Sequence, residues 1–187
     1  QKKIFSSSVC IVGCGGLGSS AAQYLSMSGV GNLMLIDNDL VNLSNLNRQT
    51  LFYEKDIGKY KVDILKKNLQ EINPESKIKI CKKKIQKNNI ANYLSRYKII
   101  LDCTDNFQSR YLINEYCFKK KKILVSAALQ NFDLQASVFS SWKKGKYPCY
   151  NCIFPKTRNT NGQSCDEQGI LAPVAGFGGV LQAMLTL

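Results

Sequence analysis

Histidine is absent from this 187-residue sequence. A Ser-His-Asp hydrolase, a histidine general base and a histidine-ligated metal site are therefore excluded. The sequence also lacks a signal peptide, an internal repeat, a low-complexity tract and any apolar run long enough to cross a membrane. From these absences we expect a cytoplasmic protein that does not bind membranes.

Acidic residues are scarce: the chain has 13 Asp and Glu but 26 Lys and Arg, which gives a formal net charge of +13. The lysines, including runs at residues 82–84 and 119–122, are spread over predicted helix faces and loops without an accompanying array of aromatic residues. A compositional bias explains this pattern, so nucleic acid is not expected as a partner. A positive field would also speed the approach of an acidic protein or an anionic nucleotide.

The eight cysteines are not spaced like the disulfide framework of a secreted protein, so we expect reduced thiols. Those in apolar segments are predicted to be small buried side chains: Cys10, Cys14, Cys81, Cys103 and Cys117. A chain of this length without a linker fits one domain.

Short apolar runs alternate with amphipathic stretches along the chain, which predicts a doubly wound, Rossmann-like α/β fold with a mostly parallel sheet. An apolar alternation over residues 130–139 predicts an antiparallel strand that extends this sheet. The predicted parallel strands are residues 9–12, 33–36, 78–80, 99–101 and 123–125, and the predicted helices are residues 19–28, 59–72, 107–118 and a last one from Ala172.

A glycine-rich turn follows the first predicted strand and precedes the first long helix. In its pattern GxGxxG, Gly13 permits the tight turn, Gly15 lets a ligand approach the backbone, and Gly18 lets the helix pack closely. The unpaired N–H groups of such a turn bind a phosphate. Asp37 ends the second predicted strand, where a carboxylate binds a nucleotide ribose. Together these residues predict a nucleotide site.

Further polar motifs follow where a fold alone needs none. Together with the glycine turn, they resemble the ThiF/MoeB adenylyltransferases, which are relatives of the ubiquitin-activating enzymes. The resemblance runs from Val9 to the last residue, and one departure is Asn47, where family members usually have Gln. The motifs are Gly13-Cys-Gly-Gly16-Leu-Gly18, Asp37-Asn-Asp39, Ser44-Asn-Leu-Asn-Arg-Gln49, Lys61, Cys103-Thr-Asp-Asn106, Cys149-Tyr-Asn-Cys152 and Cys165 before Gly169.

By this resemblance, residues 1–187 are a single ATP-binding adenylation domain that is truncated at both ends relative to the family. Arg48 and Lys61 would hold the ATP phosphates, against the alternatives of a surface salt bridge and a solvated lysine. Asp105 would bind Mg²⁺ with Asn106 beside it, and we expect Asp102 to cap the helix that follows. The nucleotide site would also include Gly13, Gly15, Gly16, Gly18, Asp37, Asp39, Ser44 and Asn45.

The remaining cysteine motifs leave alternatives open. Cys149 and Cys152 form a CxxC that is half of a tetrahedral zinc site, and the second CxxC of relatives is absent here. A redox CxxC is disfavoured because Pro155 follows too soon for the usual helix. Cys165, in a predicted loop, would take part in passing the carrier or sulfur onward in relatives. The alternative is a free exposed thiol, and no basic neighbour lowers its pKa.

The resemblance implies an ATP-dependent adenylyltransferase that activates the C-terminal glycine carboxylate of a small ubiquitin-like sulfur carrier ending in Gly-Gly. That carboxylate is ionised at neutral pH, since its pKa is about 3.5, and so needs no base. The enzyme would release pyrophosphate and work with a sulfur donor protein. Residues 51–57 and 152–155 favour a ThiS-type carrier of thiamine synthesis, with a MoaD-type carrier of molybdopterin synthesis as the alternative.

Other interpretations remain. A homodimer is expected, with residues 174–187 near its interface, although Gly176, Gly178 and Gly179 also suit close packing on the first strand. An NAD-dependent dehydrogenase would use the same glycines and Asp37 but leave the other motifs without roles. A non-catalytic, nucleotide-binding remnant is the third interpretation.

Overall fold

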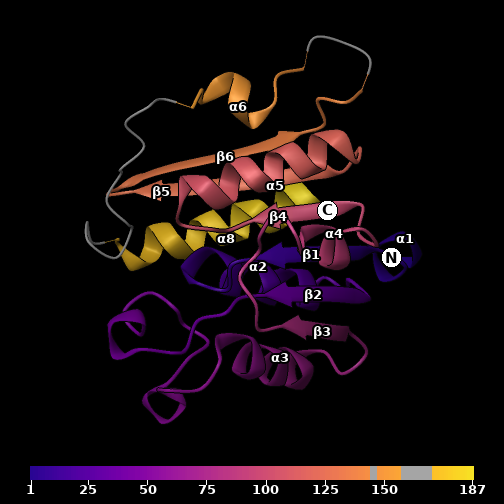
Figure 1. Cartoon of the computed structure of the whole chain (residues 1–187). Coiled ribbons are helices and arrows are strands. Elements are labelled where there is room, and N and C mark those ends of the chain that lie inside the picture. The colour runs from indigo at the N-terminus through magenta and orange to yellow at the C-terminus, as the bar shows by residue number, and fades with distance from the viewer. Residues whose placement is uncertain (144–146, 157–169) are drawn as a thin grey trace.

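The computed structural model describes residues 1–143, 147–156 and 170–187. Its centre is a six-stranded sheet in the order β3-β2-β1-β4-β5-β6, in which β1 to β5 are parallel and β6 is antiparallel to β5 (Figure 1). This confirms the predicted doubly wound fold and its antiparallel extension. The strands are β1 (Ser8–Val12), β2 (Asn32–Ile36), β3 (Lys77–Cys81), β4 (Ile99–Asp102), β5 (Ile123–Gln130) and β6 (Asp133–Phe139).

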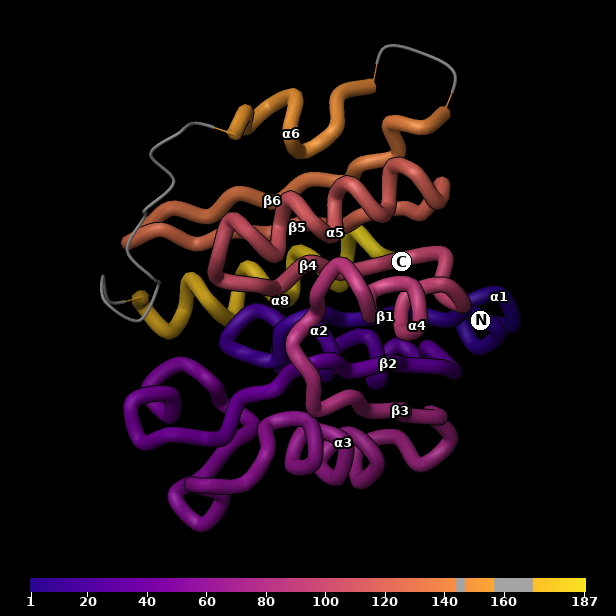
Figure 2. The backbone as a smooth tube through the Cα atoms, viewed as in Figure 1, coloured from indigo at the N-terminus to yellow at the C-terminus, as the bar shows by residue number. Residues whose placement is uncertain are grey.

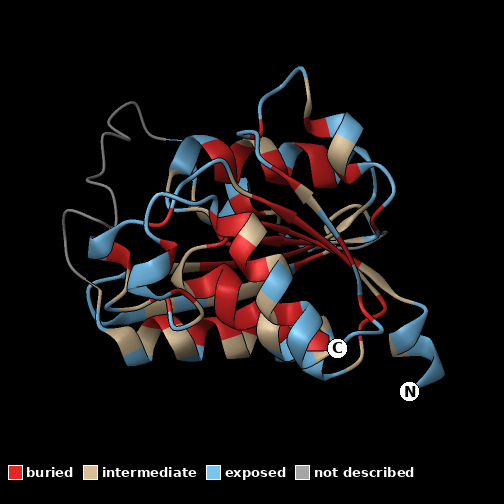
Figure 3. Cartoon of the chain, turned by 90° about the horizontal axis from the view of Figure 1, so that it is seen from below, coloured by how far each residue is buried: buried red, intermediate tan, exposed pale blue. Residues whose placement is uncertain are grey.

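Helices cover both faces of the sheet, as the tube in Figure 2 and the turned view in Figure 3 show. On one face lie α2 (Gly16–Met27), α3 (Lys61–Ile72) and α8 (Ala172–Thr186); on the other lie α4 (Ile90–Leu94), α5 (Phe107–Lys119) and α6 (Tyr150–Ile153). A short helix, α1 (Lys2–Phe5), precedes β1, and 3-10 turns occupy Leu43–Asn45 and Glu54–Asp56. The long helices lie where the periodicity predicted them.

The sheet is apolar on both sides because each face packs a separate core. Alternate residues of β1 divide between them: Val9 and Ile11 pack against α2 and α3, whereas Cys10 and Val12 pack against α4 and α5. This burial explains why the parallel strands are continuous apolar runs in the sequence. The five cysteines predicted to be buried are buried free thiols, and burial raises the pKa of Cys10 and Cys14.

The strand order reverses at β1, which pairs with β2 on one side and β4 on the other. The loops that leave these strands diverge there, so their carboxyl ends open a crevice, the usual ligand site of such sheets. Backbone hydrogen bonds fix the start of each loop: Gly13 N–H donates to Ile36 O at 2.9 Å, and Cys103 N–H donates to Val12 O at 2.8 Å.

Close helix packing explains two of the three glycines in α8. A Cβ on Gly178 would come within 2.6 Å of Leu17 Cδ2, and one on Gly179 would come within 2.5 Å of Ser20 Cβ. Both neighbours belong to α2. The alternative that these glycines pack closely on the first strand was therefore wrong, because they pack on α2. Within the described part of the chain, no helix has the length and apolar character of a membrane span.

Candidate active site

The glycine turn has the backbone geometry that only glycine allows. Gly13 has a φ of +92°, and a Cβ there would lie 2.6 Å from the carbonyl oxygen of Cys103. A Cβ on Gly18 would press on the carbonyl oxygen of Gly13 and lie 3.3 Å from Cys103 Cβ. Gly18 therefore serves close packing, whereas Gly13 serves the turn itself.

The turn leads directly into α2, whose first N–H groups have no acceptor within the helix. The first helical hydrogen bond of α2 is the one that Ser19 N–H donates to Gly15 O at 2.9 Å. The N–H groups of Gly16 and Leu17 and the positive end of the helix dipole thus lie at the crevice. A phosphate can bind here through the backbone alone.

Asp37 joins the end of β2 to the glycine turn. Its Oδ2 accepts from Cys14 N–H at 2.7 Å, and its Oδ1 accepts from Asp39 N–H at 2.8 Å. Burial raises the pKa of the Asp37 carboxyl, although Lys61 and the two backbone N–H groups act in the opposite direction. Each oxygen keeps a further lone pair for a ligand hydroxyl.

Lys61 is the first residue of α3 but is only 5% exposed, so the solvated alternative is excluded. Its Nζ lies 3.1 Å from Asp39 Oδ2, and its N–H donates to Asp39 O at 3.0 Å. The Asp39 side chain is 55% exposed, so it balances the buried ammonium while remaining hydrated itself. This arrangement holds a positive charge in the wall of the crevice.

The Ser44-to-Gln49 motif forms one compact turn. The Asn45 side chain, 3% exposed, accepts from Asn42 N–H at 3.3 Å and so holds the turn from inside. Arg48 Nη1 donates to Ser44 O at 2.8 Å and to Asn47 Oδ1 at 2.9 Å. Ser44 is exposed and contributes its carbonyl to Arg48, which fixes the position of the guanidinium.

Asp105 and Asn106 lie in the loop between β4 and α5. Asn106 Nδ2 donates to the exposed Asp105 carboxylate at 3.1 Å, and Asn106 Oδ1 accepts from Ser109 N–H at 2.9 Å. Asn106, not Asp102, is therefore the cap of α5, and the expected capping role of Asp102 was wrong. A single accessible carboxylate beside a phosphate site suits Mg²⁺, which completes its shell with phosphate oxygens and water.

Asp102 is instead buried behind the loop, at 1% exposure. It accepts from Thr104 N–H at 3.1 Å and from Ser126 Oγ at 3.0 Å, and Arg110 Nη1 lies 3.6 Å from its Oδ2. Arg110 also donates to the carbonyl oxygen of Thr104, and Gln182 of α8 donates to Asp102 O at 3.0 Å. Sequence reasoning missed Arg110 and Gln182, because neither belongs to a recognised motif.

These loops enclose a cavity of about 250 Å³ at the carboxyl ends of β1, β2 and β4. Ser44 and Gly18, two of the predicted site residues, do not line this cavity. Gln49 does line it, and its buried Oε1 has no hydrogen-bond partner among the described residues. An unsatisfied acceptor beside unpaired N–H groups suits a polar ligand. The predicted site residues that line the cavity are Gly13, Gly15, Gly16, Asp37, Asp39, Asn45, Arg48, Lys61, Asp105 and Asn106.

The CxxC lies apart from this cavity, beside α5. Cys149 precedes α6 and Cys152 lies within it, with their Sγ atoms 3.4 Å apart. Burial alone would raise the pKa of the Cys149 thiol, but hydrogen bonds from Cys152 and Asn114 lower it. No third His, Cys, Asp or Glu joins the pair in the described ranges, so the donors present are half of a zinc site. Cys165 lies outside the described residues.

Comparison with known proteins decides the family. The model of the ThiF family matches residues 1–187. The chain belongs to the ThiF family.

Its curated relatives carry more specific names. The chain is 41% identical over 188 residues to "Adenylyltransferase and sulfurtransferase MOCS3" of Drosophila willistoni, covering 100% of this chain and 41% of that protein. It is also 41% identical over 184 residues to "Molybdopterin-synthase adenylyltransferase" of Escherichia coli, covering 98% of this chain and 73% of that protein. The chain spans about half, or less, of several relatives that it matches.

Solved structures agree on the fold. The crystal structure of E. coli MccB with ATP superposes with a TM-score of 0.84 at 27% identity, covering 98% of this chain and 55% of that one. The relatives' names favour the molybdopterin alternative, and they do not support the preference for a thiamine carrier in this ThiF-family chain.

Proposed function

We propose that this ThiF-family chain adenylylates the C-terminal glycine carboxylate of a ubiquitin-like sulfur carrier, using ATP and releasing pyrophosphate. The observation that carries the proposal is one cavity that gathers the glycine turn, Asp37, Arg48, Lys61 and Asp105 from separate strand ends. A dehydrogenase would need the first two but would leave the other three without a role. The names of the relatives support the same reaction.

In the proposed reaction, a carboxylate oxygen of the carrier attacks the α-phosphorus of ATP. A new O–P bond forms, the bond from the α-phosphorus to the bridging oxygen breaks, and pyrophosphate leaves with that electron pair. No proton has to be removed, because the attacking carboxylate is already ionised. The main obstacle is repulsion between anions, so positive charge and in-line positioning are what the site must supply.

The described side chains suit these tasks. The N–H groups at the start of α2 and Asp37 would bind phosphate and ribose, with Asp39 holding Lys61 and Asn45 holding the turn. Arg48 and Lys61 would stabilise the charge that moves onto pyrophosphate. Asp105, with Asn106 beside it, would hold Mg²⁺, which neutralises phosphate charge when bound.

For the carrier, we propose a MoaD-type protein of molybdopterin synthesis. The support is that relatives are named molybdopterin-synthase adenylyltransferases, including one 36% identical over 184 residues from Gracilaria tenuistipitata var. liui. We further propose that residues 1–187 form the adenylation domain and that the protein is a homodimer. In a later step, a sulfur donor protein would attack the acyl-adenylate, and Cys165 would take part in that step only.

Exchange of labelled pyrophosphate into ATP tests the reaction. We expect exchange with a MoaD-type carrier ending in Gly-Gly, weaker exchange with a ThiS-type carrier, and none with a MoaD-type carrier that lacks the last glycine. Replacing Cys165 with alanine should leave exchange intact, since the adenylate forms first. Exchange without any carrier would contradict the mechanism. ATP binding without exchange would support the remnant, and stabilisation by NAD but not ATP would support the dehydrogenase.

A further inference from the structure

The lysine run at residues 82–84 has no role in the proposed reaction, yet the structure divides it into two parts. Lys82 is engaged away from the cavity: its Nζ lies 2.7 Å from Asp63 Oδ2 and 4.7 Å from the centre of the Tyr60 ring. Lys83 and Lys84 line the cavity that also contains Arg48 and Lys61. Composition alone does not predict this division.

The backbone that carries Lys83 and Lys84 is anchored on both sides. Before them, Cys81 O accepts from Asp37 N–H at 3.1 Å, which ties the end of β3 to the predicted ribose site. After them, Ile85 is 5% exposed in the core on the α4 side, and Asn89 Nδ2 donates to Lys84 O at 3.0 Å. The backbone of the two residues therefore has a fixed position at the cavity.

Other charged side chains of the cavity already have partners. Lys61 lies 3.1 Å from Asp39, and Arg110 lies 3.6 Å from the buried Asp102. Lys83 and Lys84 are exposed, and neither has a side-chain hydrogen bond or an ion pair with any described residue. Unpaired ammonium groups at the mouth of a cavity raise the local concentration of an anionic ligand.

We infer that Lys83 and Lys84 bind the nucleotide in its ground state, as a second basic group of the cavity distinct from Arg48 and Lys61. The inference rests on the proposed function, because it takes ATP as the anion. The two lysines follow β3, on the far side of β2 from the glycine turn, so they lie at the Asp37 end of the cavity and attract the phosphate charge of the nucleotide across it. They act on nucleotide affinity and association rate rather than on the transition state.

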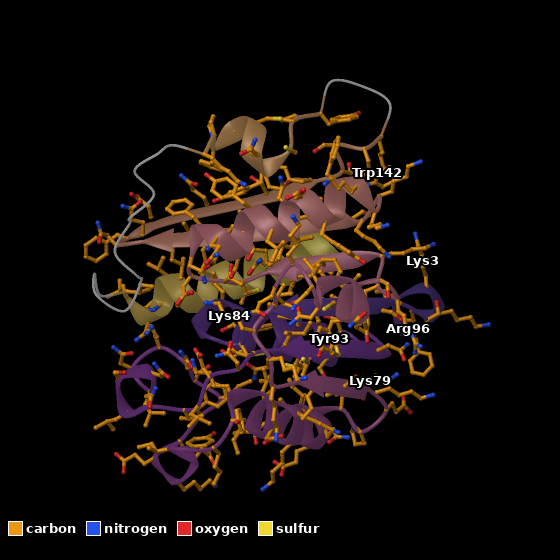
Figure 4. All side chains as sticks on the ribbon, viewed as in Figure 1. Lys3, Lys79, Lys84, Tyr93, Arg96 and Trp142 are labelled. Carbon is orange, nitrogen blue, oxygen red and sulfur yellow. The ribbon has the colours of Figure 1, made fainter. Side chains whose placement is uncertain are left out.

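The chain offers matched controls for charge. Lys79 and Arg96 are exposed basic residues outside the cavity, and Figure 4 shows both well to the right of Lys84. The double variant Lys79→Gln/Arg96→Gln removes the same charge as Lys83→Gln/Lys84→Gln but leaves the cavity intact. Lys82→Gln is a second control, within the same run.

The experiment measures the Kd of a fluorescent ATP analogue at low and high salt, then kcat and KM in pyrophosphate exchange. Lys83→Gln/Lys84→Gln should raise the Kd about tenfold at low salt, the scale of removing two exposed charges close to a polyanion, and flatten its salt dependence. The kcat should stay within about twofold of the unaltered protein, since uniform binding does not change the chemical step. Both control variants should bind ATP like the unaltered protein.

Several results would overturn the inference. An equal loss of affinity in the Lys79→Gln/Arg96→Gln control would assign the effect to the overall field. A raised KM for the carrier with an unchanged ATP Kd would make the lysines a partner-binding surface. If the unaltered protein binds ATP and the double variant binds it equally well, only this inference falls; if the unaltered protein does not bind ATP, the proposed function falls as well.

Discussion

Replacing Lys61 with methionine should lower the rate of catalysis strongly and the free energy of unfolding only slightly. The geometry of the Lys61–Asp39 pair predicts this difference. Methionine keeps most of the buried apolar stem of Lys61 and removes the ammonium that lies 3.1 Å from Asp39. The remaining Asp39 side chain is 55% exposed and stays hydrated. The buried Asp37, whose pKa is raised by burial and lowered in part by Lys61, keeps its hydrogen bonds from the Cys14 and Asp39 N–H groups. We expect the free energy of unfolding to fall by no more than about 1 kcal/mol, which lowers the Tm by roughly 2–4 °C.

The catalytic effect should be much larger, because Lys61 is proposed to stabilise charge on the leaving pyrophosphate. Loss of one preorganised donor in such a site costs about 3 kcal/mol, or about 10²-fold in kcat. The assay is pyrophosphate exchange with a saturating carrier, with thermal unfolding measured on the same samples. An exchange rate within about threefold of the unaltered protein would refute the reasoning.

Lys59→Met is the matched control. Lys59 lies 3.3 Å from Asp56 in the same loop but outside the cavity, and here the acid is the buried partner, since the side chains are 54% and 6% exposed. Removing Lys59 should therefore cost more stability than removing Lys61, about 1–2 kcal/mol, because a buried carboxylate loses its cation. Exchange should be unchanged. If Lys59→Met lowers exchange as much as Lys61→Met, the effect on exchange belongs to the loop rather than to Lys61.

Two further predictions concern the glycine turn and pH. Gly18→Ala should lower the free energy of unfolding by about 1–3 kcal/mol, since the new Cβ would clash with the carbonyl oxygen of Gly13. Gly176→Ala should raise it by about 0.5–1 kcal/mol, because a Cβ on Gly176 meets nothing and alanine favours the helix. Equal Tm values for the two variants would contradict this prediction. ATP affinity should fall as the pH decreases, because protonation of Asp37 removes an acceptor for the ribose. The midpoint of this fall should lie above the ordinary Asp pKa of about 3.9, because the pKa of Asp37 is raised in the folded protein. Asp37→Asn should abolish that dependence in titrations of Kd against pH, and an unchanged profile would assign it to another group.

Local sequence patterns predicted the helices and strands well where the burial of an element requires one kind of residue along its length. Buried parallel strands are apolar along their whole length, so β1 to β5 were predicted within a few residues, except for the longer carboxyl end of β5. The short α4 and the two 3-10 turns escaped prediction, because segments of three to five residues do not complete a recognisable period. Asp102 and Asn106 have similar capping preferences, so local rules could not choose between them.

The sequence by itself determined the glycine turn and the places of Asp37 and Asp105 after β2 and β4, since these depend on backbone geometry within a short stretch of chain. It also determined the family, because the motifs are read directly from the residues. Tertiary structure decided which side chains share the site. Arg110 and Gln182 reach the Asp102 loop from α5 and α8, and Gln182 is 80 residues from the backbone oxygen that it binds. The same holds for residues 82–84: Lys82 finds its acid on α3 while Lys83 and Lys84 line the cavity. Partners so distant along the chain meet only when the sheet and its helices have packed, and no local pattern specifies them.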